Sequence, residues 1–361
     1  MIIVLLTIAA VALLAFANGA NDVSKGIATL AGSGRATYRQ ALAWGTAWTA
    51  IGAAASLVIT FGLVEAFTSA LVASNVLALP TFALGAAAGA SAWVLFASRT
   101  GLPVSTTHAM TGAIVGVAVA AGGTGAVQWP LLAATIAAPL ALSPLVSAGI
   151  AFGIQGLAAR AAPACVCVEQ EMALAVNADG TATALAAPTV AVGQACAPAA
   201  GRLRVLAGPV MHWGAAAALS FARGVNDNAK IAALGALAFA SLGGDVVWAF
   251  LIAGLAMTAG SFIAGLRVSR TLAERVVHMD ADSGLAGALV SAGLVLAASF
   301  YVLPVSTTHV ATGAIVGAGL RQGGGAVEWR TVGGLVTAWV VTLPVAAALG
   351  AAAVWMLQLL A

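Results

Sequence analysis

The chain has 361 residues, of which 62% are apolar and 7% are charged, and its formal net charge at pH 7 is +3. So large an apolar share with so few charges excludes a soluble globular domain and indicates a polytopic membrane protein. The sequence lacks a nucleotide-binding glycine loop, a Gly-x-Ser-x-Gly elbow and a zinc-protease helix. We therefore expect a protein that is not an enzyme and does not bind nucleic acid.

Ten apolar segments follow one another along the chain, five in each half. They cover about 2–30, 41–64, 77–98, 102–121 and 129–158, then about 206–239, 246–266, 284–303, 305–320 and 331–360. Several are long enough to cross a hydrocarbon core about 30 Å thick. The fourth segment of each half is short and begins beside a proline, which is typical of a re-entrant or broken helix. The first segment has no basic residues before it and is expected to be a retained helix.

A less apolar segment, 159–205, separates an N-terminal membrane repeat, 1–158, from a C-terminal one, 206–361. It holds all three cysteines, Cys165, Cys167 and Cys196, and its turn-forming run 177–180 predicts a small β-hairpin. We expect this linker to be cytoplasmic and its thiols to be free, because the cytosol is reducing. A metal-binding or redox role is the alternative, although no fourth metal ligand is visible nearby.

The loop charges predict how the halves are oriented. Since each half has an odd number of segments, the two halves run through the membrane in opposite directions, as inverted repeats. With both termini outside, every loop arginine falls on the cytoplasmic side, as the positive-inside rule requires, and the outward loops carry only Glu65 and Asp245. The inward arginines are Arg35, Arg39, Arg99, Arg160, Arg202, Arg204, Arg267, Arg270, Arg275, Arg321 and Arg330. The chain is thus expected to be an all-α, multi-pass protein of the cell inner (plasma) membrane, in contact with the lipid bilayer.

The first duplicated polar motif lies in the first segment of each half. It reads Asn21-Asp22-Val23-Ser24-Lys25 and returns as Asn226-Asp227-Asn228-Ala229-Lys230, with Arg223 just before the second copy. Ionisable groups at membrane depth cost about 2.5–3.5 kcal/mol each on insertion scales. An aspartate and a lysine three residues apart share one helix face, so a self-neutralising structural pair is one reading. Symmetric duplication favours a functional site instead.

The second duplicated motif opens the fourth segment of each half. It reads Pro103-Val104-Ser105-Thr106-Thr107-His108 and returns as Pro304-Val305-Ser306-Thr307-Thr308-His309. Proline favours the first turn of a helix and Ser or Thr caps it, so each copy predicts a helix N-terminus with free N–H groups. Six hydroxyls at two such ends suit a tetrahedral oxyanion, with helix capping alone as the alternative. The histidines are expected to orient the preceding turn, or else to carry protons.

With these two motifs, the chain resembles the inorganic phosphate transporters of the PiT type, over roughly 10–158 and 210–358. The resemblance implies an inverted-repeat symporter, usually cation-coupled, that imports orthophosphate by alternating access, and mildly favours a homodimer. It implies that Asn21, Asp22, Asn226 and Asp227 line the ion and substrate site. The implied phosphate ligands are Ser105, Thr106, Thr107, Ser306, Thr307 and Thr308. Gly19, Gly224 and the two prolines are expected to mark breaks in the helices around the site.

The chain departs from the usual family pattern at Lys25 and Lys230, because an ammonium there would repel sodium. We hypothesise that the lysines replace one or both sodium ions, which favours proton over sodium coupling without any bound metal or cofactor. The two aspartates give −2 and the lysines with Arg223 give +3, so a divalent anion leaves −1. The alternatives are a permease for sulfate or another oxyanion, a passive anion channel, and an aspartyl hydrolase, which the lysines disfavour.

Overall fold

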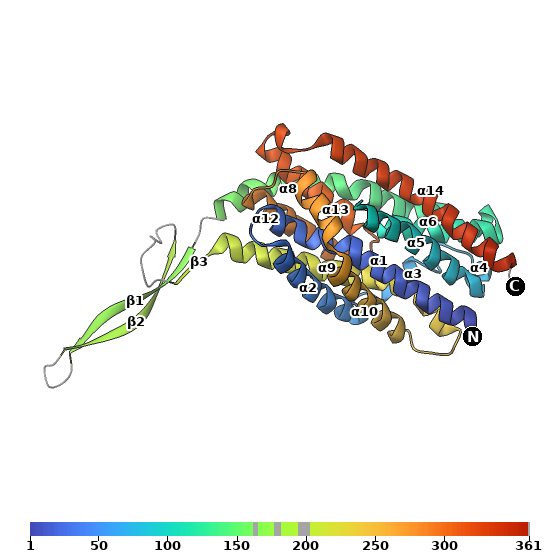
Figure 1. Cartoon of the computed structure of the whole chain (residues 1–361), viewed down its shortest axis with the longest axis horizontal. Coiled ribbons are helices and arrows are strands. Elements are labelled where there is room, and N and C mark those ends of the chain that lie inside the picture. The colour runs from blue at the N-terminus through green and yellow to red at the C-terminus, as the bar shows by residue number, and fades with distance from the viewer. Residues whose placement is uncertain (162–164, 177–181, 194–202, 360–361) are drawn as a thin grey trace.

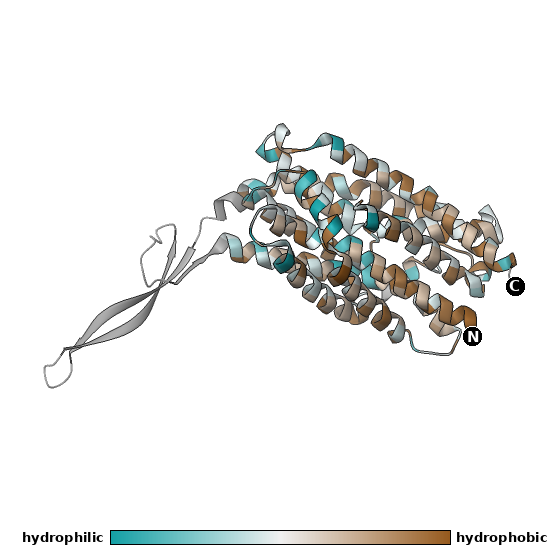
Figure 2. Cartoon of the chain, viewed as in Figure 1, coloured by the Kyte–Doolittle hydropathy of each residue, from teal (hydrophilic) through white to brown (hydrophobic). Residues whose placement is uncertain are grey.

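The computed structural model describes residues 1–161, 165–176, 182–193 and 203–359. Figure 1 shows a bundle of long helices with both termini at one end and the strands extending from the other. We call these the terminal end and the linker end. Figure 2 shows the helices mainly brown, with teal residues inside the bundle and towards the linker end. This distribution is that of a membrane protein with a polar interior.

The elements of the first half are α1 (Ile2–Gly32), α2 (Tyr38–Ile59), α3 (Phe61–Ala66), α4 (Ser74–Leu77), α5 (Pro80–Thr100), α6 (Thr106–Gly122), η1 (Thr124–Ala126), α7 (Trp129–Leu131), η2 (Leu132–Ala137) and α8 (Ala138–Ala161). Those of the second half are α9 (Ala207–Ala240), α10 (Val247–Ala264), α11 (Leu266–Arg275), α12 (Ala281–Phe300), α13 (Thr307–Gln322), η3 (Gly324–Ala326) and α14 (Trp329–Leu359). Among the described residues, seven helices are long and apolar enough to cross a membrane. The prediction of an all-α multi-pass membrane region is confirmed.

The third and fourth segments of each half form a helical hairpin. The chain before α5 and the chain after α6 lie together at the terminal end, where Ala73 N–H donates to the Ala126 carbonyl at 2.9 Å. The chain before α12 and the chain after α13 are joined in the same way by His278 and Ala326, at 3.0 Å. We call α5–α6 the first hairpin and α12–α13 the second. The fourth segment of each half is thus a short helix, and the third segment forms the hairpin with it.

Corresponding helices of the two halves pack on each other reciprocally. α1 packs on α10 while α9 packs on α2, and α6 packs on α14 while α13 packs on α8. In Figure 1, α1 starts at the terminal end and α9 starts at the linker end, so these two long helices are antiparallel. The two hairpins accordingly belong to opposite ends of the bundle.

The expectation that Gly19 and Gly224 break their helices is wrong. Both α1 and α9 run without interruption through these positions. A Cβ at Gly19 would overlap the carbonyl of Met257 in α10, and a Cβ at Gly224 would overlap that of Thr49 in α2. The glycines are there because two helix backbones touch, as is usual between membrane helices.

Pro103 and Pro304 also lie outside the helices they were expected to begin. α6 starts at Thr106 and α13 at Thr307, after N-cap serines, so each proline stands two residues before the cap, in the extended tip of its hairpin. Proline disfavours helical backbone in the residue before it, which keeps this tip extended.

The linker forms a three-stranded antiparallel sheet in the order β2-β1-β3, from β1 (Cys165–Val176), β2 (Ala182–Gly193) and β3 (Leu203–Leu206). The predicted hairpin is thus present as the β1–β2 pair, while its expected turn at 177–180 lies outside the described residues. Cys165 and Cys167 belong to β1, and Cys196 is likewise outside the described part. Within that part, no group of three His, Cys, Asp or Glu residues is placed to hold a metal.

Candidate functional site

The tips of the two hairpins meet inside the bundle. The hydroxyl of Thr107 donates to the Val305 carbonyl at 3.5 Å, and the hydroxyl of Thr308 donates to the Val104 carbonyl at 2.9 Å. Because α6 and α13 begin here, two helix N-termini from opposite ends of the molecule converge on one region. Their unpaired N–H groups and positive dipole ends favour an anion between them.

Each of the two N-termini is capped by the serine of its motif. The Oγ of Ser105 accepts from the backbone N–H of His108 at 3.2 Å, and the Oγ of Ser306 accepts from that of His309 at 3.3 Å. Capping therefore accounts for one acceptor position of each serine. The hydroxyl proton remains available as a donor, so capping and ligand binding are compatible.

Asn21 ties α1 to the first hairpin. Its side-chain amide donates to the Leu102 carbonyl at 2.9 Å and to the Oγ of Ser98 at 3.2 Å, and its Oδ1 accepts from the backbone N–H of Val104 at 3.2 Å. In the second half, Asn226 donates to the Oγ of Ser299 at 2.9 Å. The motif asparagines thus fasten each long helix to the hairpin of its own half.

Ser98 and Ser299 were not among the predicted site residues, although the sequence contains a pattern that indicates them. Each lies five residues before the proline of its motif and is therefore duplicated with it. Asn18 lies four residues before Asp22, which puts the two side chains on one face of α1.

Lys25 is enclosed by oxygens of its own motif. Its ammonium pairs with Oδ1 of Asp22 and donates to Oδ1 and the main-chain carbonyl of Asn21, at 3.1 and 3.3 Å. A carboxylate, an amide oxygen and a peptide carbonyl thus converge on one cation. These are the neutral and anionic oxygen ligands that an alkali cation would use.

Lys230 behaves differently and reaches across to both hairpin tips. It donates to the Val305 carbonyl at 2.6 Å and to the Oγ1 of Thr107 at 3.1 Å, while its ammonium lies 3.7 Å from Oδ1 of Asp227. The two lysines occupy equivalent sequence positions, yet only Lys230 joins a long helix to the point where the hairpins meet.

Asn18 joins the two copies of the motif. Its side-chain nitrogen lies 3.1 Å from Oδ2 of Asp22, 3.4 Å from Oδ2 of Asp227 and 3.1 Å from the Oγ1 of Thr106. One amide group is thus shared by both carboxylates and a hairpin hydroxyl. Oδ2 of Asp22 also accepts from the hydroxyl of Thr307, a residue of the second hairpin, at 3.4 Å.

Arg223 completes the cluster from α9. Its guanidinium donates to the hydroxyls of Thr49 and Ser261, at 2.8 and 3.1 Å, and lies 3.5 Å from Oδ1 of Asn18. Its Nε has no hydrogen-bond partner among the described residues, and neither does Oδ1 of Asn226. The structure therefore brings Arg223 together with both aspartates through Asn18.

The whole cluster is buried and carries more positive than negative charge. Each of its side chains is at most 4% exposed. With two aspartates against two lysines and Arg223, the formal charge is −2 + 3 = +1. Buried charge without a counter-charge is costly, so the cluster favours an added anion. Its members are Asn18, Asn21, Asp22, Lys25, Ser105, Thr106, Thr107, Arg223, Asn226, Asp227, Lys230, Ser306, Thr307 and Thr308.

The two motif histidines lie together but point away from this cluster, towards α8 and α14. Their ring centroids are 4.6 Å apart, and both rings line an apolar cavity of about 790 Å³. Nδ1 of His309 donates to the Leu140 carbonyl at 2.8 Å; that carbonyl lacks its usual helical donor because residue 144 is proline. Nδ1 of His108 has no partner among the described residues. The side chain of His309 thus contacts α8 rather than the preceding turn, and the role expected of the histidines stays a prediction.

Comparison with known proteins agrees with this architecture. Residues 18–350 match the phosphate transporter family. The chain belongs to that family. It is 27% identical to the "Probable low-affinity inorganic phosphate transporter" of Mycobacterium leprae (strain TN), covering 96% of this chain and 76% of the relative. It is 29% identical to the "Inorganic phosphate transporter 2-1, chloroplastic" of Arabidopsis thaliana, covering 93% and 69%.

Among solved structures, the chain is similar to one titled "The sodium-dependent phosphate transporter", with a TM-score of 0.81 and 22% identity over 100% of both chains. The likeness shows that this member of the phosphate transporter family has the fold of that protein. The resemblance drawn from the duplicated motifs is therefore confirmed at the level of family and fold.

Proposed function

We propose that this family member is a secondary active transporter that imports inorganic phosphate across the cell membrane by alternating access. The observation that carries the proposal is the meeting of two hairpin tips, from opposite ends of the bundle, at one buried cationic cluster. A site shared by two such hairpins can be opened to either face by moving one hairpin at a time.

We further propose that residues 1–158 and 206–361 are inverted repeats, joined by a cytoplasmic linker, with both termini outside. The reciprocal packing of α1 on α10 and α9 on α2 supports a two-fold relation between the halves. The antiparallel course of α1 and α9 supports an axis in the plane of the membrane.

In this proposal, phosphate lies between the N-termini of α6 and α13. The serine and threonine hydroxyls of the two hairpin motifs supply directed donors, and Lys230 and Arg223 supply positive charge. Hydrogen phosphate also carries a proton that it can donate to a carboxylate such as Asp227, which sulfate lacks. This chemistry favours phosphate over sulfate.

The lysines take the place of coupling cations. Three oxygens converge on the ammonium of Lys25, and three more lie within 3.7 Å of that of Lys230. A sodium ion at either place would compete with a permanent positive charge for the same oxygens. Uptake is therefore driven by protons and does not require sodium.

Radiolabelled phosphate uptake into proteoliposomes tests both statements. The expected result is accumulation under an imposed proton gradient, without stimulation by a sodium gradient and without competition from excess sulfate. Accumulation driven only by sodium overturns the role of the lysines. Competition by sulfate overturns phosphate selectivity, and current without accumulation identifies a channel.

Lys25→Asn is the sharpest variant, because it removes the ammonium and leaves an additional oxygen ligand in its place. We expect it to make uptake sodium-dependent. Lys25→Arg is the matched control, since it keeps the charge and should stay insensitive to sodium. If Lys25→Asn is active and remains indifferent to sodium, the lysine does not replace a cation.

A further inference from the structure

A pocket on the linker side of the first hairpin holds two arginines that the central cluster does not use. It is an open pocket of about 390 Å³ between α1, α5, α10 and the start of α11, and both arginines are exposed. A neighbouring pocket of about 500 Å³ shares Leu266 and Arg267 with it and adds Arg270, Glu274 and Arg275 of α11. Together they form a depression with an excess of positive charge at the linker end.

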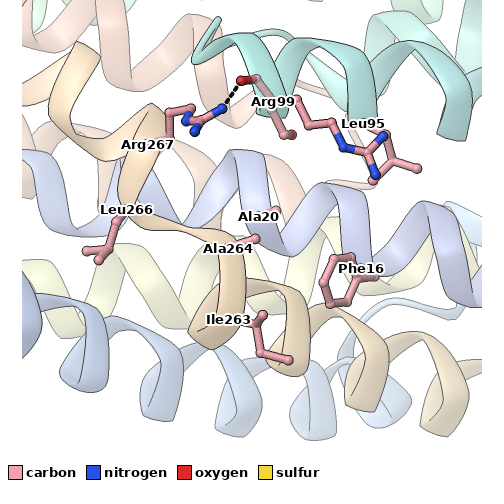
Figure 3. A pocket seen from close by; sticks show the side chains of 9 residues that line it. Phe16, Ala20, Leu95, Arg99, Ile263, Ala264, Leu266 and Arg267 are labelled. Carbon is pink, nitrogen blue, oxygen red and sulfur yellow. Dashed lines mark hydrogen bonds between the residues drawn. The ribbon is translucent and has the colours of Figure 1, made fainter.

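The two arginines of the first pocket differ in their hydrogen bonding. Arg267 donates a hydrogen bond to the carbonyl oxygen of Arg99, one of the last carbonyls of α5, which a helix leaves without an internal donor. The Arg99 guanidinium has no hydrogen-bond or ion-pair partner within the described part of the chain. Figure 3 shows both side chains above Ala20 and Ala264, with Arg99 reaching along α5 towards Leu95.

The inner wall of this pocket is also the outer wall of the central cluster. Ser98, which lines the pocket, accepts a hydrogen bond from Asn21 at 3.2 Å, and Asn21 in turn accepts one from Lys25. The pocket and the buried cationic cluster are thus separated by one layer, made by α5 and α1. Moving the first hairpin away from α1 would break that layer and join the two spaces.

We propose that Arg99 and Arg267 form an anion subsite that holds inorganic phosphate between the central cluster and the face carrying the linker. The subsite rests on the proposed function and adds a second phosphate-binding position to the proposed transport path. A guanidinium has several N–H donors in one plane. Arg267 uses one of them for the hydrogen bond to the Arg99 carbonyl, so both side chains retain donors for a phosphate. Positive charge lining a concave pocket also raises the local concentration of anions.

The arginine at position 99 is not repeated in the second half. Phe300 occupies the position of Arg99, since it follows Ser299 as Arg99 follows Ser98. The hairpin from the linker end therefore presents an aromatic ring at its tip where the first hairpin presents a guanidinium. The subsite belongs to one face only, which makes it testable by measuring the two faces separately.

The test is phosphate exchange by the full chain in proteoliposomes whose orientation is assigned by protease digestion. The phosphate concentration that gives half-maximal exchange is measured at the linker face and at the opposite face. The variants are Arg99→Gln, Arg267→Gln and the double variant. We expect the double variant to raise the linker-face value roughly tenfold and to leave the opposite-face value unchanged. Added salt should weaken the linker-face affinity of the unaltered protein and have less effect on the variant.

Arg330→Gln is the matched control, because it removes an exposed positive charge at the start of α14 without touching the pocket. It should leave both values unchanged. Equal values at the linker face for the unaltered protein and the double variant overturn the subsite while the proposed function stands. Equal losses at both faces assign the arginines to folding or topology. If the unaltered protein exchanges no phosphate, the proposed function fails and the subsite fails with it.

Discussion

The two hairpins share their tip chemistry and differ in what surrounds it. Each carries the same Pro-Val-Ser-Thr-Thr-His motif, caps its second helix with serine and offers a threonine hydroxyl to the other tip. Behind the tip, the first hairpin has Arg99 and Gly101, whereas the second has Phe300 and Val302. The hairpin tips are therefore alike in the two halves, whereas the residues just before each tip differ.

The contacts of the two motif lysines also differ between the halves. Lys25 is held entirely by Asn21 and Asp22 of its own helix, while Lys230 is held mainly by the hairpin tips. The two lysines occupy equivalent positions of the motif and yet have different partners in this structure.

The largest effect is expected from the shared helix contacts. Gly19→Val or Gly224→Val forces a side chain into the backbone of the facing helix, at Met257 or Thr49. Each variant should lose roughly 3 kcal/mol of stability or more, which size-exclusion profiles and thermal unfolding in detergent would show. Gly214→Ala, in α9 with no atom within 4 Å of the added Cβ, is the control and should be tolerated. Tolerance of valine in one half alone would break the symmetry of the helix contacts.

The next largest difference between the two halves is expected from the aspartates, Asp22 and Asp227. Asp22→Asn removes the carboxylate that forms an ion pair with buried Lys25 and is expected to cost about 3 kcal/mol. Asp227→Asn leaves Lys230 its contacts with Val305 and Thr107 and should cost about 1 kcal/mol. Thermal unfolding of the two variants in the same detergent gives the comparison. Equal losses would mean that the different lysine contacts carry no energetic difference.

The sequence indicated which polar residues would lie together, because each motif occurs twice. The structure brings Asp22, Asp227 and the hairpin threonines into one cluster, and their part in binding phosphate stays a prediction. The role of Gly19 could not be predicted, since the reason for it is the main chain of Met257, 238 residues further along. The contact between Arg267 and Arg99 is equally remote in sequence, and both residues were predicted only as inward-facing charges.

Replacing the motif histidines is expected to change the stability less, and mainly at His309. His309→Phe leaves the Leu140 carbonyl only the hydroxyl of Ser143 as a donor, at 3.3 Å, and should cost about 1 kcal/mol. His108→Phe removes an unpartnered nitrogen and should stay within about 0.5 kcal/mol of the unaltered protein. Thermal unfolding measures both, and phosphate uptake across a range of pH is the second readout. A change in the pH profile caused by His108→Phe would assign proton transfer to that ring and contradict a passive role.

The smallest effect concerns the backbone at the two tips. Val302 adopts φ of +56°, a left-handed conformation that a β-branched residue rarely takes, whereas its counterpart Gly101 adopts φ of +80° without strain. Val302→Gly should therefore stabilise the folded protein by about 1 kcal/mol, the released strain exceeding the entropy cost of glycine. Gly101→Val should destabilise it by a similar amount, because it imposes the same strain and brings a Cβ to 3.3 Å from Cγ of Arg267. Thermal unfolding records both shifts. If Val302→Gly instead destabilises the protein and slows exchange at one face only, the strained residue is part of the movement of the second hairpin, and the difference between the two tips is a difference in how easily each one opens.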